Sequence, residues 1–162
     1  MHPDLLDTAI KLLLTVNTDA PSQSDLRRSV STAYYSMFHF VAQSCSFSLA
    51  SGSAKQLKRA ENQVARSLDH RDIVSACAFA LDIANGFPSE IKEFSSAFRD
   101  LNRCRSRADY DSTADGDFSL PYALSKVSDA ETAIRRFQSA HPDDQRAFAI
   151  LCAVKPPRGE RR

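Results

Sequence analysis

The sequence predicts an all-α protein with six or seven helices, and three observations lead to this fold class. Only four of the 162 residues are glycine, and no run of Val, Ile and Thr alternates with polar residues as a half-buried strand requires. Apolar residues instead recur at every third or fourth position along most of the chain. Hydrophobic residues make up 43% and charged residues 25%, which is ordinary for a globular domain and excludes disorder as the main state. We therefore expect one helical domain over residues 1–154.

The first two predicted helices are separated by a turn-rich segment at residues 17–21. The first is expected over residues 3–17, where Leu and Ile recur at helical spacing. The second begins after Ser22, because Ser22 and Asp25 have the spacing of a capping box, and an apolar stripe extends it to about Phe47. That stripe contains Leu26, Val30, Ala33, Tyr34, Met37, Val41 and Cys45.

The third and fourth predicted helices follow a turn that contains glycine. Ser53 and Gln56 have the spacing of a second capping box, and apolar residues at helical spacing continue to about Asp69. The fourth helix is expected over residues 73–84. Gly86 is expected to end it, since glycine enters the left-handed region of φ at little cost.

Three more helices are expected in the second half of the chain. Pro88 suits the first turn of the fifth helix, whose apolar face extends to Ala108. A polar loop at residues 111–119 separates it from the sixth helix, expected over residues 122–137. Pro142 can open a short seventh helix.

Composition and charge restrict the partners and the location of the protein. With 21 Lys and Arg against 20 Asp and Glu, the net charge is +1, so nucleic acid would have to bind a local patch. The longest apolar run, residues 76–81, is far shorter than the roughly 20 residues that span a bilayer. The N-terminus lacks the order of a secretory signal, and four scattered cysteines predict free thiols. We expect a soluble cytoplasmic protein without a membrane partner, whose residues 155–162 form a basic, disordered tail.

Arg105 lies on the apolar face of the fifth predicted helix, between Leu101 and Ala108. Leaving a guanidinium unpaired at the edge of the core would cost on the order of several kcal/mol. Arg105 therefore needs a carboxylate, a carbonyl or an anionic ligand such as phosphate. The alternative to a ligand site is a structural salt bridge with Asp109 or with an acid elsewhere.

A polar face on the second predicted helix is a further candidate site. It gathers Arg28, Thr32, Tyr35 and His39 beside the apolar stripe and could line a cleft. The alternative for His39 is a histidine that is hydrogen-bonded within the packing. His70 and His141 stand near predicted helix ends, where capping or a surface position accounts for them.

Positive charge is concentrated on the fifth and sixth predicted helices and could form a local anion-binding patch. The alternative is a solvated face, because nearby aspartates offset much of the charge. These aspartates lack the spacing of a calcium loop, and no phosphate-binding glycine loop or Ser-His-Asp order is present, so we expect no metal site and no classical hydrolase or nucleotide kinase. The arginines concerned are Arg99, Arg103, Arg105, Arg107, Arg135 and Arg136.

Two blocks of the sequence resemble the signatures of prokaryotic HEPN-domain proteins. The first is residues 27–39, RRSVSTAYYSMFH, in which a double Tyr is followed by Phe-His. The second is residues 98–111, FRDLNRCRSRADYD, in which an Arg on a late helix is followed by Ala-Asp-Tyr. The order and the spacing of both blocks agree with the family, and the resemblance covers about residues 3–140.

The resemblance implies an antiparallel, up-and-down helical bundle that pairs into a homodimer, with Arg105 facing a cleft at the subunit interface. Many HEPN proteins are metal-independent endoribonucleases, in which an Arg and a following His on this helix cleave RNA with the RNA's own 2′-hydroxyl as nucleophile. Others are noncatalytic binding modules, and the family occurs in toxin–antitoxin and antiviral systems. In this chain Tyr110 stands where the His often falls. His39 could replace that His if the second helix borders the cleft.

We favour three functions in the following order. The first is a homodimeric binding or regulatory module for RNA or a nucleotide phosphate, with a cognate antitoxin protein as a candidate partner. The second is an endoribonuclease toxin in which Arg105 stabilises charge, and the third is a purely structural dimer. No cofactor and no metal are expected. The candidate catalytic residues are Arg105, Asp109, Tyr110 and His39, and the candidate phosphate- or RNA-binding residues are Arg28, Tyr35, Arg103 and Arg107.

Overall fold

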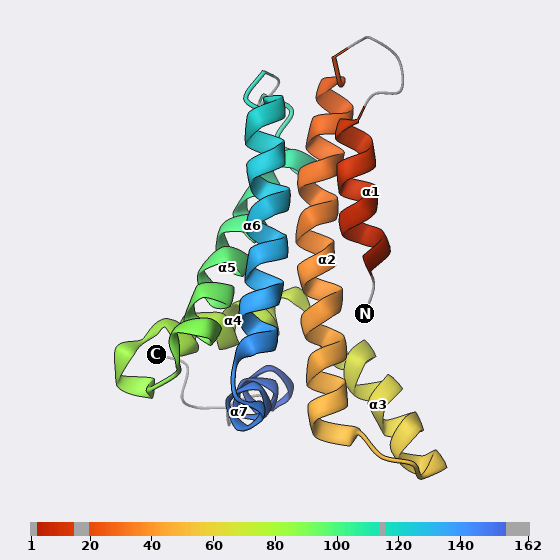
Figure 1. Ribbon diagram of the computed structural model, residues 1–162, viewed down its shortest axis with the longest axis vertical. Coiled ribbons are helices and arrows are strands. Elements are labelled where there is room, and N and C mark those ends of the chain that lie inside the picture. The colour runs from red at the N-terminus through yellow and green to blue at the C-terminus, as the bar shows by residue number, and fades with distance from the viewer. Residues whose placement is uncertain (1–2, 15–19, 114–115, 155–162) are drawn as a thin grey trace.

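The computed structural model describes residues 3–14, 20–113 and 116–154, which form seven α-helices and one short 3-10 turn (Figure 1). No strand occurs in these residues, so the predicted all-α fold of six or seven helices is confirmed. The helices are α1 (Pro3–Leu13), α2 (Gln23–Ala50), α3 (Lys55–Ser67), α4 (His70–Leu81), α5 (Ser89–Tyr110), α6 (Leu120–Ser139) and α7 (Pro142–Ala153), and the 3-10 turn is η1 (Ile83–Asn85).

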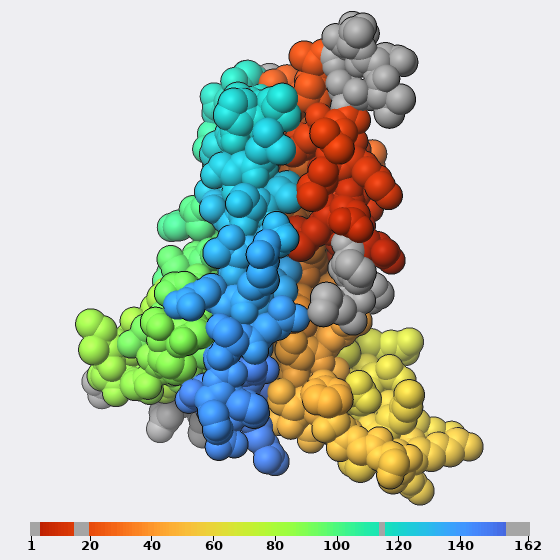
Figure 2. Space-filling model, viewed as in Figure 1, coloured from red at the N-terminus to blue at the C-terminus, as the bar shows by residue number. Residues whose placement is uncertain are grey.

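Four of the helices, α1, α2, α5 and α6, run alternately up and down, and α4 and α7 lie across one end of them (Figure 1). Helix α2 is central, because it packs against α1, α3, α5, α6 and α7. Helix α3 follows the end of α2 and protrudes from the side of the bundle (Figure 2). The result is one antiparallel bundle around α2 with a single peripheral helix.

Helix α2 begins where the sequence predicts and ends later. The Ser22 hydroxyl accepts the backbone N–H of Asp25 at 3.2 Å, and the Asp25 carboxylate accepts the backbone N–H of Ser22 at 3.3 Å. The predicted capping box is therefore confirmed. The helix continues beyond Phe47 to the buried Ala50, because the first helix-breaking residue of this segment is Gly52.

Phenylalanine rings hold the middle of the bundle together. Phe94 of α5 is fully buried, and its ring centroid lies 4.9 Å from that of Phe137 on α6 and 6.1 Å from that of Phe148 on α7. Phe40 of α2 and Phe98 of α5 complete the cluster at centroid distances of 6.3 and 5.9 Å from Phe94. Edge-to-face and tilted pairs of this kind add to the stabilisation from burial alone.

The prediction that Ser53 caps the third helix is wrong. Helix α3 begins at Lys55, and Ala54 occupies its N-cap without a side-chain hydrogen bond. Gln56 is therefore the second helical residue, whereas a capping box requires Gln at the third. The apolar residues of α3 have helical spacing as predicted, yet none of them is buried, and only Leu68, directly after the helix, reaches the core.

Helix α4 is displaced toward the N-terminus relative to the expected residues. It begins at His70, because the Asp69 carboxylate caps it by accepting two backbone N–H groups at 2.8 and 2.9 Å. It ends at Leu81, and the Asp82 carboxylate starts the separate turn η1. Gly86 adopts a φ of 68° and ends η1 rather than α4.

The other helix ends lie close to their expected places. Helix α1 ends at Leu13, short of the expected 3–17, and the last residues of that range lie outside the described part of the chain. Pro88 is the N-cap of α5, directly before the first turn, and Pro142 opens α7. The tail at 155–162, predicted to be disordered, also lies outside the described residues.

Phe94→Ala is expected to lower the free energy of unfolding by about 3–5 kcal/mol, because it empties the centre of the phenylalanine cluster. Leu57→Ala on α3 is the control and should cost less than about 1 kcal/mol, because 39% of Leu57 is already exposed. Urea unfolding followed by circular dichroism measures both values. Equal costs for the two variants would contradict this description of the core.

Candidate functional site

Arg105 lies at the edge of the core with its guanidinium paired. Only 14% of its side chain is exposed, and its Nη2 donates a hydrogen bond of 2.8 Å to the Tyr35 hydroxyl. Its Nε lies 3.0 Å from Asp109 Oδ2, but the N–H is not aligned for a hydrogen bond, so this contact is an ion pair only. The salt bridge with Asp109 that the sequence offered as an alternative to a ligand is therefore present.

Aromatic rings surround the same cation. The Cζ atom of Arg105 lies 5.6 Å from the ring centroid of Tyr34, 5.3 Å from that of Tyr35 and 5.6 Å from that of Tyr110. Burial acts to lower the pKa of Arg105, but the hydrogen bond with Tyr35 and the charge of Asp109 raise it overall. The guanidinium therefore keeps its charge, and cation–π contacts add to its stabilisation.

Three polar contacts tie α2 to α5 in antiparallel register. Tyr35 meets Arg105, and one turn away the Ser31 hydroxyl donates to Asp109 Oδ1. One turn further, Arg27 donates to the backbone carbonyl of the C-cap residue of α5. Because each step is one helical turn on α2, the three contacts form a polar seam along one side of the apolar core.

His70 lies among the residues that surround Arg105, although its position in the sequence did not indicate this. We call this group, which is Arg105 with Tyr34, Tyr35, Asp109, Tyr110 and His70, the Arg105 cluster. It is the first residue of α4, and its Nδ1 lies 2.6 Å from the Tyr34 hydroxyl. Its ring centroid lies 4.2 Å from that of Phe38 and 5.9 Å from that of Tyr35. Only the packing of α4 against the bundle brings His70 to the group that surrounds Arg105, and no spacing motif could have revealed it.

Burial lowers the pKa of His70, and the positive charge of Arg105 lowers it further, whereas Asp69 acts to raise it. The position of His70 at the N-terminus of α4 also disfavours a positive charge. Burial raises the pKa of Tyr34 as well, so its hydroxyl stays protonated. At neutral pH the pair is therefore an uncharged imidazole hydrogen-bonded to an uncharged phenol.

A groove of about 510 Å³ lies beside the Arg105 cluster, between the N-terminal half of α2 and the C-terminal end of α5. Arg27 and the exposed Arg28 line it, together with the hydroxyls of residues 24, 31, 32 and 35. Asp109 is the one acid in the lining, and it is already engaged by Arg105 and Ser31. The hydroxyls of Ser31 and Thr32 already donate to Asp109 and to the Arg28 carbonyl, so the groove offers its cations and the hydroxyls of Ser24 and Tyr35. This is chemistry that recognises an anion such as phosphate.

The structure brings some of the sequence candidates to this groove. Tyr35, Asp109 and Arg28 line it, and Arg105 lies directly behind the first two rather than in the lining itself. Tyr110 is 75% exposed at the end of α5, next to Arg105.

Other sequence candidates lie outside the groove. Arg103 is 74% exposed and pairs with Asp100, and Arg107 pairs with Asp117 at 2.6 Å, so neither lines the groove. His39 is exposed on α2, and its ring contacts Phe38 at a centroid distance of 5.4 Å.

Among the described residues, no helix combines the length and apolarity needed to cross a membrane. No three His, Cys, Asp or Glu side chains in that part of the chain gather as a metal site requires. Comparisons of the chain with family models, curated proteins and solved structures find no match.

The lowered pKa of His70 predicts how stability depends on pH. The unfolded imidazole binds a proton near its ordinary pKa of 6.5, whereas the folded one binds it only at lower pH. The stability that depends on neutral His70 should therefore be fully present above pH 6.5. It should be lost as the pH falls from 6.5 through the lower pKa of the folded state.

Chemical denaturation at pH 8, 6.5 and 5.5 tests this expectation against His70→Gln, which removes the titrating group. The free energy of unfolding of the unmodified protein should fall more steeply with acid than that of His70→Gln. Parallel pH profiles for the two proteins would show that His70 does not titrate differently on folding.

Proposed function

We propose that the protein is a HEPN-like RNA-binding module, active as a homodimer, that holds an RNA phosphate in the groove between α2 and α5. The observation that carries the proposal is the arrangement of the arginines at that groove. Arg28 is exposed in the lining, and Arg105 is fixed behind it by Tyr35 and Asp109 with its charge retained. The two sequence blocks that resemble the HEPN signatures form the two walls of this groove.

The balance of charge favours an anionic ligand. Arg28 and Arg105 contribute two positive charges at or directly behind the lining, and Asp109 contributes one negative charge. A phosphodiester therefore enters a site with an excess of cationic groups that are already positioned, which reduces the ordering required on binding. Guanidinium groups also match phosphate oxygens in geometry.

The tyrosines favour RNA over an isolated phosphate. Tyr35 lines the groove, and the exposed Tyr110 ring lies beside Arg105 at the end of α5. Aromatic rings next to arginines are the usual surface on which unstacked RNA bases pack. A purely structural role for Arg105 accounts for its pair with Asp109, whereas a ligand site also accounts for exposed Arg28 in the lining of the same groove.

Arg28→Gln and Arg105→Gln are each expected to weaken binding of a single-stranded RNA by about tenfold or more, which corresponds to losing one charge-assisted contact. Fluorescence anisotropy with labelled RNA measures the Kd, and light scattering of the complex should give the mass of two chains.

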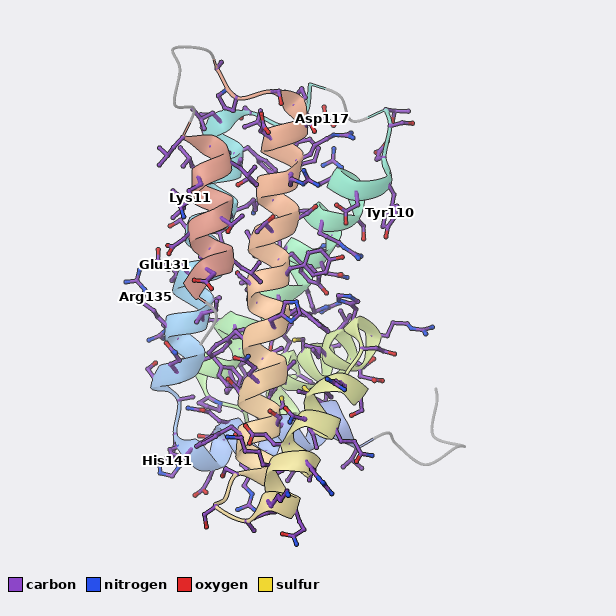
Figure 3. All side chains as sticks on the ribbon, turned by 90° about the vertical axis from the view of Figure 1, so that its right-hand side faces the viewer. Lys11, Tyr110, Asp117, Glu131, Arg135 and His141 are labelled. Carbon is purple, nitrogen blue, oxygen red and sulfur yellow. The ribbon has the colours of Figure 1, made fainter. Side chains whose placement is uncertain are left out.

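Arg135→Gln is the matched control, because Arg135 lies on the opposite side of the molecule from Tyr110 (Figure 3). RNA affinity that neither groove variant reduces would contradict the proposal. If Arg105→Gln only destabilised a protein that binds no RNA, the structural dimer would be the better description.

An endoribonuclease is the second candidate, and His70 is the observation that favours it. Cleavage of RNA by its own 2′-hydroxyl requires a group that takes the proton and a cation that stabilises the phosphorane. His70 is an imidazole in the same cluster as Arg105, with Nδ1 bonded to the Tyr34 hydroxyl. In the tautomer in which Nδ1–H donates to Tyr34, the lone pair of Nε2 remains to accept the proton. This assignment gives the base role to His70 in place of Tyr110 or His39.

The second candidate predicts cleavage of RNA in excess chelator, with cyclic phosphate ends on the products. His70→Gln and Arg105→Gln should each reduce the rate by about a hundredfold or more, the size of effect expected for a general base or a charge-stabilising group. Because burial and Arg105 lower the pKa of His70, the rate should persist below pH 6.5. Tyr110→Phe and His39→Gln separate this assignment from the alternatives and should leave the rate nearly unchanged. Intact RNA at high protein concentration would leave the binding module alone as the proposed function.

A further inference from the structure

We propose that α3 is a second contact for the RNA strand, and that the strand runs from the α2–α5 groove along α2 to the cationic face of α3. The inference rests on the proposed function, because it takes RNA as the ligand. The cationic face of α3 is defined as the side chains of Lys55, Lys58, Arg59 and Arg66, all of which are exposed.

The cations of α3 have no carboxylate partners in the part of the chain that the structure describes. Among the described residues, none of the four side chains of the cationic face forms an ion pair. Glu61 is the single acid of the helix, so α3 carries four positive charges against one negative charge. Elsewhere in the bundle many cations are neutralised by neighbours. On α5 and α6, for example, carboxylates pair with Arg103, Arg105, Arg107, Lys126, Arg135 and Arg136.

Helical spacing places these charges on one side of α3. Positions 55, 58, 59, 62 and 66 recur every three or four residues, and the face spans about 16 Å at 1.5 Å per residue. Leu57 and Val64 lie on the opposite side, and α3 packs against α2. Leu57 closes over Gly52 in the turn between the two helices, where a Cβ atom at Gly52 would collide with the Leu57 side chain. The half-buried Val64 therefore lies on the side of α3 opposite the cationic face, and the cations point into solvent.

The surface of α3 itself also offers donors suited to a nucleic acid. A shallow hollow of about 400 Å³ is lined by Arg59, Asn62, Gln63, Arg66 and Ser67. Two guanidinium groups, two amides and a hydroxyl converge there without an acid. Phosphate and sugar oxygens are bound by this mixture of side chains in protein–nucleic acid complexes.

The groove and α3 lie along one face of α2. The face that presents Arg28, Tyr35 and His39 continues at helical spacing to Ala42 and Ser46. The first three positions are at least partly open, whereas Ala42 and Ser46 are buried in the half of α2 that carries α3. Figure 3 shows α3 in front of that half of α2, with the other half uncovered by it. From Arg28 to Ser46 the axis of α2 rises about 27 Å, so one strand can contact both surfaces.

The end of α3 returns to the Arg105 cluster. Ser67 closes the helix, and His70 follows three residues later with its ring against Phe38 and its Nδ1 near the Tyr34 hydroxyl. Three residues span at most about 11 Å, so the Arg66 end of the cationic face is the end nearer to the groove. A membrane surface is the poorer occupant, because the apolar side of α3 is turned to α2.

The test replaces all four residues of the cationic face with Gln, a good helix former, so that α3 is retained. The matched control replaces Lys11, Lys92, Arg135 and Arg136 with Gln, which lowers the net charge equally at other surfaces. Binding is measured with labelled single-stranded RNAs of about 4 and about 20 nucleotides over a series of salt concentrations. Arg28→Gln is measured beside them as the groove variant.

The α3 variant is expected to weaken binding of the longer RNA by about tenfold or more and to leave the shorter RNA within about twofold. The slope of log K against log salt should fall by up to about 3 for the longer RNA, since each lost phosphate contact removes about 0.7. The control should reproduce neither change.

Three outcomes would overturn the inference. If the longer RNA binds in a manner that depends on Arg28 but the α3 variant keeps the full slope, α3 makes no contact and the proposed function stands. If neither RNA binds the unmodified protein, the proposed function fails and the inference fails with it. If polyglutamate binds through the cationic face and RNA does not, the occupant is an acidic polypeptide.

Discussion

The pairing of Arg105 at the seam between α2 and α5 is the interaction on which the rest of the site depends. A guanidinium that is only 14% exposed is tolerated because it donates a hydrogen bond to Tyr35 and its charge is balanced by Asp109. Asp109 is in turn held by Ser31, so the two helices are locked at two successive turns. This lock places Arg28 at the rim of a groove and sets the position of Tyr34 and Tyr35, which His70 contacts when α4 packs on the bundle. A shift of either helix by one residue would separate all of these groups at once.

Much of the fold could be predicted because it depends on local chemistry. The reciprocal hydrogen bonds of Ser22 and Asp25 lie within one turn, and their spacing alone indicates where α2 begins. The beginning of α3 could not be read in the same way, because Ala54 occupies its N-cap and no side chain caps the helix. Amphipathic spacing correctly indicated that α3 is a helix. It carried no information on how much of the apolar side another element would cover.

The candidate site likewise contains contacts that follow from local sequence and contacts that depend on how the helices pack. The Arg105–Asp109 pair joins residues one turn apart on a single helix, so the sequence contains it. The contact between Arg105 and Tyr35 required two helices to meet in the correct register, and the resemblance of the two sequence blocks was the signal that linked them. His70 could not be found in advance. Its contacts with the tyrosines follow from the way α4 packs on the bundle. In the sequence, its place at the end of a predicted helix was already enough to explain a histidine at this position.

Helix α2 contains neither glycine nor proline over its 28 residues and is therefore a continuous rod. The groove occupies one half of this rod and α3 is attached to the other half. The number of α2 residues between the two surfaces therefore fixes the distance between them along the helix axis. Each added residue would lengthen that distance by about 1.5 Å and rotate the far half of α2 by about 100°. Whole turns would preserve the alignment of the two surfaces and change only the distance between them. If one RNA strand occupies both surfaces, as proposed, the number of residues in α2 sets the shortest strand that can reach both.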